Sequence, residues 1–311
     1  MSIKPVAIAL YLFFACASLP AQTVWQPSPG HTQIALWPGT PPDLQKVDGP
    51  EKLETDNAPK ELVAGKPWLY ISNVTRSTIT VYSPKVHNTG AAVVVFPGGG
   101  YEILAIDLEG TEVCDWLVQK GITCVLLKYR VPAPRKTKYW GAYPESPIAL
   151  EDAQRAIGLV RLHAAEWHID PHKLGVLGFS AGGYLVAQIS TNFAKPLYAP
   201  IDDADKQSSR PDFSVAVYPG HLSTKDNQLN PNVPVSKETP PTFIVQAEDD
   251  HVDGVEQALV YFRALSDAQV PVEMHLYAEG GHAFGLRPTR QPITHWPVLV
   301  EDWLRTIHVI Q

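Results

Sequence analysis

Strand-like and helix-like segments alternate along most of the chain, and this alternation restricts the fold more than any other feature of the sequence. Residues 91–96 are apolar without a break, which is typical of a strand buried on both faces. Residues 148–167 carry apolar side chains at helical spacing. Such alternation predicts an α/β fold, with a mostly parallel central sheet and helices on both faces. The other expected strands are residues 69–74, 78–82, 122–127, 174–177, 213–218, 243–246 and 272–277, and the other expected helices are residues 109–120, 181–189, 255–267 and 297–307.

The domain organisation follows from length and composition. The 311 residues suit one large α/β domain or two small ones, and no shift in composition marks a boundary. We therefore assign residues 67–311 to one domain, and residues 22–66, which are rich in proline and glycine, to an extended segment packed on it. The net charge is -7 and no run of lysine or arginine occurs, which argues against nucleic acid and anionic membrane surfaces as partners.

Residues 1–21 have the pattern of an export signal. Lys4 supplies the positive charge, and the apolar run 6–17 is too short for a stable membrane anchor. Small residues allow cleavage after Ala17 or Ala21. A buried or membrane-anchoring helix is the alternative. We expect a secreted or periplasmic bacterial protein, with no stable membrane insertion once the signal is removed.

Two cysteines, Cys114 and Cys124, lie in the expected domain, one in a predicted helix and the other in the strand after it. They could pair in an oxidising compartment, but we expect two buried free thiols. No CxxC, HExxH or clustered His/Cys spacing occurs, so neither a metal nor another cofactor is expected.

The stretch "VLGFSAGG" places Ser180 between a predicted strand and a predicted helix, inside the pattern G-x-S-x-G. A serine at this position occupies a tight, strained turn, and Gly178 and Gly182 leave room for it. The turn also aims the serine at the positive end of a helix. In this strand–turn–helix context the pattern predicts a catalytic nucleophile, with a merely tight turn as the alternative.

A glycine run follows the apolar strand 91–96, in "VVVFPGGGY". Backbone N–H groups without side chains around them can point at a substrate oxygen, so the run Gly98 to Gly100 is expected to form one half of an oxyanion hole. The N–H of Ala181, directly after the nucleophile, would form the other half. A phosphate-binding turn is the alternative, but the sequence lacks the lysine and the spacing of such loops.

The expected base is His282, in "AEGGHAFGL", which follows the last strand and is flanked by glycines. The expected acid lies in "FIVQAEDDHVDGVEQ", where the chain order Ser, acid, His fits this kind of site. Asp253 begins a D-x-x-E pattern and is interpreted as a helix cap. Glu248 has a longer, less rigid side chain. The spacing leaves Asp249 and Asp250 open.

The motifs occur in an order that resembles secreted bacterial α/β-hydrolases of the carbohydrate acetylesterase, or acetylxylan esterase, family. The resemblance runs from about Thr32 to the C-terminus. It implies an α/β-hydrolase catalytic domain and a serine esterase that acts on carbohydrate esters, most simply acetyl esters. The matching segments are "ALWPGTPP", "AAVVVFPGGGYEILAIDLEG", "WLVQKGITCVLLKYRVP", "LEDAQRAIGLVR", "HKLGVLGFSAGGYL", "PTFIVQAEDDHV" and "HLYAEGGHAFGLR".

The resemblance also implies site residues. Ser180 corresponds to the nucleophile, His282 to the base, and Asp249, the first aspartate of the Asp-Asp pair, to the acid of the triad. The N–H groups of Gly99, Gly100 and Ala181 correspond to the oxyanion donors. The family often has His, Pro and Asn-Ser where this chain has Tyr184, His251 and Gln257-Ala258, which leaves the fit to substrate open.

The expected partner is a small-molecule or oligosaccharide ester. Candidate substrate contacts, on loops near the predicted strand ends, are Tyr101, Trp140, Tyr143 and His221. Loops 129–146 and 194–212 could form a lid. One alternative is a serine peptidase of the prolyl-oligopeptidase kind, although we expect the stretch before the glycine run to be too short for the extra domain of those enzymes. A feruloyl or short-chain esterase, and an inactive hydrolase used as a binding module, are the others.

Overall fold

The computed structural model describes residues 24–44, 49–131 and 147–311, and the predicted export signal lies outside them. Within these residues an eight-stranded sheet has the order β1-β4-β7-β5-β8-β9-β10-β11. The strands from β7 to β11 pair in parallel, and β1 and β4 are antiparallel at one edge. The strands are β1 (Gln33–Ala35), β4 (Thr78–Tyr82), β5 (Ala92–Phe96), β7 (Thr123–Lys128), β8 (Leu174–Phe179), β9 (Phe213–Val217), β10 (Thr242–Ala247) and β11 (Val272–Tyr277).

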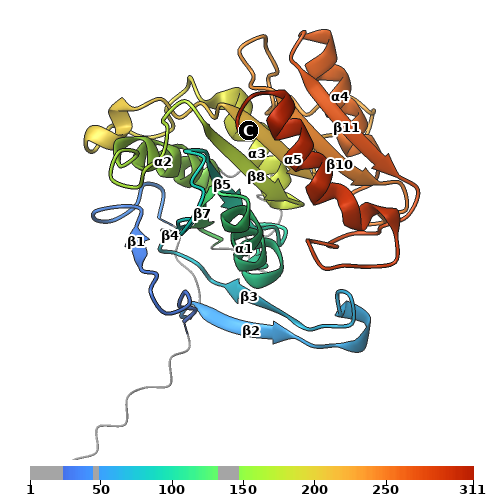
Figure 1. The fold of residues 1–311 in the computed structure, drawn as a ribbon, viewed down its shortest axis with the longest axis horizontal. Helices are drawn as coiled ribbons and strands as arrows, with labels where there is room; N and C mark the ends of the chain where they lie inside the picture. Colours follow the sequence, from blue (N-terminus) through green and yellow to red (C-terminus); the bar gives the residue numbers. More distant parts are fainter. Residues whose placement is uncertain (1–23, 45–48, 132–146) are drawn as a thin grey trace, which may run out of the picture.

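Helices cover both faces of this sheet. The crossover from β5 to β7 runs in the opposite direction along the sheet to those from β7 to β8 and from β8 to β9, so right-handed connections place α1 on one face and α2 and α3 on the other. On the α1 face, α5 packs with the ring of Trp296 5.9 Å from that of Trp116. Figure 1 shows α1 and α5 in front of the sheet. The helices are α1 (Glu112–Gln119), α2 (Ile148–Leu162), α3 (Ala181–Asn192), α4 (Glu256–Asp267) and α5 (Trp296–Thr306).

The reversal between β5 and β8 positions the site. These two strands are adjacent and parallel, yet the chain leaves β5 in one direction along the sheet and continues from β8 in the other. Loops beyond the carboxyl ends of strands diverge at such a point and leave space for a ligand. The glycine run follows β5 and the serine turn follows β8, so the topology brings together two motifs that lie about eighty residues apart in the sequence.

Residues of the expected extended segment pack on the domain from several directions. Strand β1 pairs with β4, and the side chains of Trp25, Leu36 and Trp37 are buried. A second, three-stranded antiparallel sheet joins β2 (Lys52–Asp56), β3 (Trp68–Ser72) and β6 (Ile103–Leu104). In Figure 1, β2 and β3 lie below the central sheet. Short helices complete the chain at η1 (Pro59–Glu61), η2 (Asp107–Thr111, a π-helix), η3 (Asp203–Lys206) and η4 (Pro292–His295).

The two cysteines of the domain form a disulfide, so the expectation of two free thiols is wrong. Cys114 lies on α1 and Cys124 on β7, and their Cα atoms are 5.1 Å apart. That separation is within the range of disulfides. It arises because α1 packs directly on the strand that follows it, which the positions in sequence alone did not reveal.

Candidate active site

Ser180 occupies a strained turn between β8 and α3. Its φ is 51° and its ψ is -117°, a conformation that side chains rarely adopt. The flanking glycines are required by close approach. A Cβ on Gly182 would lie 2.1 Å from the carbonyl oxygen of Phe96, and a Cβ on Gly178 would lie 2.2 Å from the carbonyl oxygen of Gly182. The sequence pattern therefore forms the tight strand-to-helix turn that the motif predicts.

Three side chains form a connected chain of hydrogen bonds at this turn. Ser180 Oγ lies 3.0 Å from His282 Nε2, and His282 Nδ1 lies 2.7 Å from Asp250 Oδ2. The other oxygen of Asp250 accepts hydrogen bonds from the backbone N–H groups of Val252 and Asp253, at 2.9 and 3.0 Å. Asp250 is buried and held by its own turn, so it fixes the orientation of the imidazole.

The structure thus places Asp250 against His282, whereas the family resemblance pointed to Asp249. The carboxylate of Asp249 has another task, because its Oδ1 accepts hydrogen bonds from the N–H groups of Gly280 and Gly281, at 2.9 and 2.7 Å. Asp249 therefore shapes the loop that carries the histidine. The sequence spacing did not distinguish the two aspartates, and the contact with His282 now selects Asp250 as the partner of the histidine.

Asp253 also differs from its expectation as a helix cap. Helix α4 begins at Glu256 after Val255, and no side chain caps it. The carboxylate of Asp253 instead turns to the nucleophile, with Oδ2 3.4 Å from Ser180 Oγ and 3.9 Å from His282 Nε2. The acidic loop therefore brings two carboxylates to the serine and the histidine.

The glycine run lies directly beside the serine. A Cβ on Gly98 would lie 3.0 Å from Ser180 Cβ, and Gly99 and Gly100 have φ values of 128° and 63°. Among the described residues, no hydrogen bond uses the N–H of Gly99 or Gly100. The N–H of Ala181 is in the first turn of α3, where N–H groups have no intrahelical partner. These three donors are the ones the sequence suggested for an oxyanion hole.

A buried carboxylate, which the sequence reasoning missed, fixes this loop. Glu109 accepts hydrogen bonds from Gly98 N (2.6 Å) and from the hydroxyl of Tyr218 (2.7 Å). The ring of Tyr218 lies 4.9 Å from the ring of His282. Glu109 thus connects the glycine run with the support of the histidine. The only signal in the sequence was the position of Glu109, at helical spacing with the apolar residues Val113 and Leu117 of the predicted helix 109–120.

The local charges act on the histidine and on the buried acids. Burial acts to lower the pKa of His282, but the hydrogen bond and charge of Asp250, with the charges of Asp253 and Glu109, raise it above its ordinary value. Burial raises the pKa of Glu109 and of Asp253. The site therefore favours the imidazolium form, which a general base must become during proton transfer.

The candidate substrate contacts fare differently. Tyr101 is buried, and its hydroxyl lies 3.4 Å from Gln188 Oε1, so its ring is part of the interior. His221 is exposed on the loop after β9, with its ring 6.4 Å from that of Tyr184. Trp140 and Tyr143 lie outside the described residues, as does most of the 129–146 segment suggested as part of a lid.

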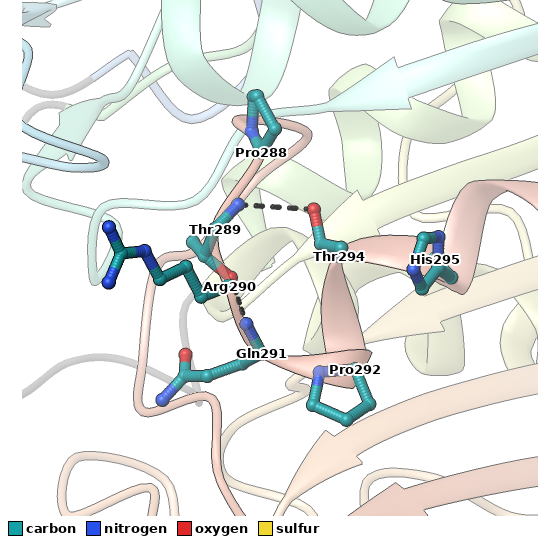
Figure 2. Close-up of a pocket in the computed structure, with 7 residues that line it drawn as sticks. All are labelled: Pro288, Thr289, Arg290, Gln291, Pro292, Thr294 and His295. Atoms are coloured by element: carbon teal, nitrogen blue, oxygen red, sulfur yellow. Dashed lines mark hydrogen bonds between the residues drawn. The ribbon is translucent and has the colours of Figure 1, made fainter.

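No metal or membrane feature emerges from the described residues. They contain no group of three or more His, Cys, Asp or Glu side chains arranged to hold a metal ion. No helix among them combines the length and apolarity needed to cross a bilayer. The pocket in Figure 2 is distant in sequence from the serine, and its walls contain none of the three hydrogen-bonded residues. It is lined by Pro288, Thr289, Arg290, Gln291, Pro292, Thr294 and His295.

A sequence model described as the prolyl oligopeptidase family matches residues 150–307, from α2 to the last helix. The match contains the serine turn, the acidic loop and the histidine loop. The chain belongs to the prolyl oligopeptidase family. Solved structures described as α/β-hydrolases or esterases align over most of the chain, so the predicted fold class is confirmed.

Relatives of this prolyl oligopeptidase family member include an acetylxylan esterase and an endo-1,4-beta-xylanase. The chain is 31% identical over 231 residues to an acetylxylan esterase of Xylanibacter ruminicola. The alignment covers 70% of this chain and 45% of that protein. It is 28% identical to endo-1,4-beta-xylanase B of Butyrivibrio fibrisolvens, over 61% of this chain and 32% of that protein. The chain therefore spans less than half the length of these two relatives.

A solved relative matches over nearly its whole length. The acetyl ester-xyloside bifunctional hydrolase of Caldicellulosiruptor lactoaceticus is 30% identical, with a TM-score of 0.70. The alignment covers 90% of this chain and 97% of that structure. The resemblance to acetylesterases predicted from sequence motifs is confirmed by these comparisons.

Proposed function

We propose that this protein is a serine esterase that releases acetate from acetylated carbohydrates through an acyl-enzyme. The observation that carries the proposal is the hydrogen-bonded chain Ser180–His282–Asp250 beside the open N–H groups of the glycine run. The relatives described as an acetylxylan esterase and as an acetyl ester-xyloside hydrolase support the choice of ester.

The first step uses the distances of the site. With Nδ1–H donating to Asp250, the neutral imidazole has its lone pair on Nε2, facing Ser180 Oγ. His282 takes the serine proton while Oγ forms a bond to the ester carbonyl carbon. The N–H groups of Gly99, Gly100 and Ala181 stabilise the oxyanion, each by about 3 kcal/mol. As the intermediate collapses, His282 gives its proton to the leaving alcohol oxygen and the acyl-enzyme remains.

The second step repeats the chemistry with water. His282 accepts a proton from water, which attacks the acyl carbon and forms a second tetrahedral intermediate. When that intermediate breaks, the bond to Ser180 Oγ is cleaved, the proton returns to the serine oxygen, and acetate leaves. No cofactor takes part in either step.

A peptidase is the second candidate, because the family model carries the name of a peptidase family. The same triad can cleave amides and esters, so the fold does not decide. The names of the relatives favour esters. Feruloyl and other short-chain esters remain alternatives within the same chemistry.

Export is a further part of the proposal. Residues 1–21 have the charge and apolar pattern of a signal peptide, and the Cys114–Cys124 disulfide suits an oxidising compartment. A secreted or periplasmic enzyme would meet plant polysaccharide fragments outside the cytoplasm.

Removal of the nucleophile tests the mechanism. Ser180→Ala should reduce kcat on a p-nitrophenyl acetate substrate by about 10⁵- to 10⁶-fold, since the triad acts as a unit. The wild-type protein should be labelled by a fluorophosphonate and the variant should not. Activity of the variant near the wild-type level, or labelling that survives the substitution, would contradict the assignment.

A further inference from the structure

The carboxylate of Asp253 touches the nucleophile but has no place in the triad. Its Oδ2 lies 3.4 Å from Ser180 Oγ, and the residue is only 9% exposed. Asp250 already holds Nδ1 of His282, so Asp253 is on the other side of the imidazole, near Nε2. A second carboxylate at that nitrogen is not required for the proton transfers of ester hydrolysis.

The backbone holds Asp253 firmly in this position. Its N–H donates to Asp250 Oδ1 (3.0 Å), and its carbonyl oxygen accepts from Gln246 Nε2 (2.6 Å). The neighbouring loop leaves space for the carboxylate, because a Cβ on Gly220 would lie 2.6 Å from either of its oxygens. The side chain is therefore fixed by its surroundings and is aimed at the serine.

The carboxylate lacks a strong partner within the protein. Among the described residues, Oδ1 makes no hydrogen bond, and no Lys or Arg side chain pairs with Asp253. Burial and the nearby charge of Asp250 raise its pKa. The side chain of Asp253 is 12% exposed and Oδ1 is not a fully buried atom, so this acceptor is accessible and can take a hydrogen bond from a bound ligand.

The position of the leaving group indicates which substrate group could donate a hydrogen bond to Asp253. During collapse of the intermediate, the leaving alcohol oxygen must lie within hydrogen-bond reach of His282 Nε2. Asp253 Oδ2 is 3.9 Å from the same nitrogen. A group on the carbon next to the esterified one therefore comes close to the carboxylate. In a sugar or other polyol, that group is a hydroxyl.

We propose that Asp253 is a specificity-determining residue that accepts a hydrogen bond from a free hydroxyl adjacent to the ester in the alcohol part of the substrate. This inference rests on the proposed esterase function and narrows its substrates to partially acylated sugars. A carboxylate in the alcohol part would be repelled at the same place, so esters of acidic sugars should be poor substrates.

The test compares two sugar esters and one simple ester. The substrates are a monoacetylated methyl xyloside with a free neighbouring hydroxyl, the same ester with that hydroxyl replaced by hydrogen, and p-nitrophenyl acetate. The enzymes are wild type, Asp253→Asn, Asp253→Ala and a control, Glu248→Ala, whose exposed side chain is in the same loop.

In the wild type, kcat/KM should be about 10- to 100-fold higher for the ester with the hydroxyl than for its deoxy analogue. Asp253→Ala should bring the ratio of kcat/KM between the two sugar esters to about one, whatever its effect on p-nitrophenyl acetate, and Asp253→Asn should give an intermediate ratio because its amide oxygen still accepts. The control should match the wild type. An unchanged preference in Asp253→Ala, or an equal loss on all three substrates, would overturn the proposal. Failure of the wild type on every ester would instead contradict the esterase function.

Discussion

At the scale of single residues, the adjacent Asp249 and Asp250 have different roles, although they are the same residue type and the sequence does not distinguish them. Asp250 faces His282, and Asp249 binds two glycine N–H groups of the histidine loop. The serine, the histidine and the glycine run could be found from the sequence because their motifs carry backbone requirements. The acid of the triad could not be identified from the sequence, because its role depends on the direction in which the side chain of Asp249 or Asp250 points from the loop.

Separate substitutions measure the tasks of the two aspartates. Asp250→Asn should reduce kcat by about 10⁴-fold, because the imidazole loses the partner that selects its tautomer. Asp249→Asn should cost far less in kcat, since an amide oxygen can still accept from Gly280 and Gly281. Steady-state kinetics on p-nitrophenyl acetate would check this, and a larger loss at Asp249 would restore the assignment implied by the family.

The charges around the histidine set the pH dependence. The pKa of His282 is raised above 6.5, so the base remains protonated to a higher pH than an isolated histidine. Activity should therefore appear only as pH rises through a midpoint above about 6.5. Asp253→Asn removes one of the raising charges and should move the midpoint of kcat/KM for p-nitrophenyl acetate to lower pH. A midpoint that stays in place or rises would contradict this account.

At the scale of elements, the hydrophobic pattern predicted the strands from β3 to β11 in the central domain within a few residues, except the two-residue β6. The spacing of apolar residues shows which side chains are buried, so it locates strands and helices well. It missed β1, β2 and the π-helical turn η2, where few or irregular apolar residues contribute. Contacts between elements, such as the pairing of Cys114 with Cys124, depend on packing and were not predictable from the pattern.

The disulfide should stabilise the fold without affecting the chemistry. It joins α1 to β7 and closes a loop with a sequence separation of 10. In the chain-entropy account, closing a loop of this size adds about 3 kcal/mol to the free energy of unfolding. The double variant Cys114→Ala/Cys124→Ala should unfold at a lower temperature and keep wild-type kcat and KM at 25 °C. A thermal melt with and without reductant would check it. An unchanged Tm, or lost activity in the folded variant, would disagree with a purely structural role.

At the scale of the whole molecule, topology explains why distant motifs form one site. The reversal of direction between β5 and β8 sets the glycine run against the serine, and β10 and β11 carry the acidic and histidine loops to the same edge. This edge is predictable once a parallel sheet is inferred, because functional loops lie at carboxyl ends. The order of strands in the sheet is not, since it depends on long-range packing.

We propose that this molecule hydrolyses acetyl esters of sugars in preference to peptide bonds. The most direct measurement is a side-by-side comparison of acetate release from acetylated xylan and acetylated xylosides with cleavage of an aminoacyl-amide and of a feruloyl ester. We expect efficient acetate release that Ser180→Ala abolishes, with little cleavage of the aminoacyl-amide or of the feruloyl ester. Faster cleavage of the aminoacyl-amide than of any acetylated sugar would contradict it.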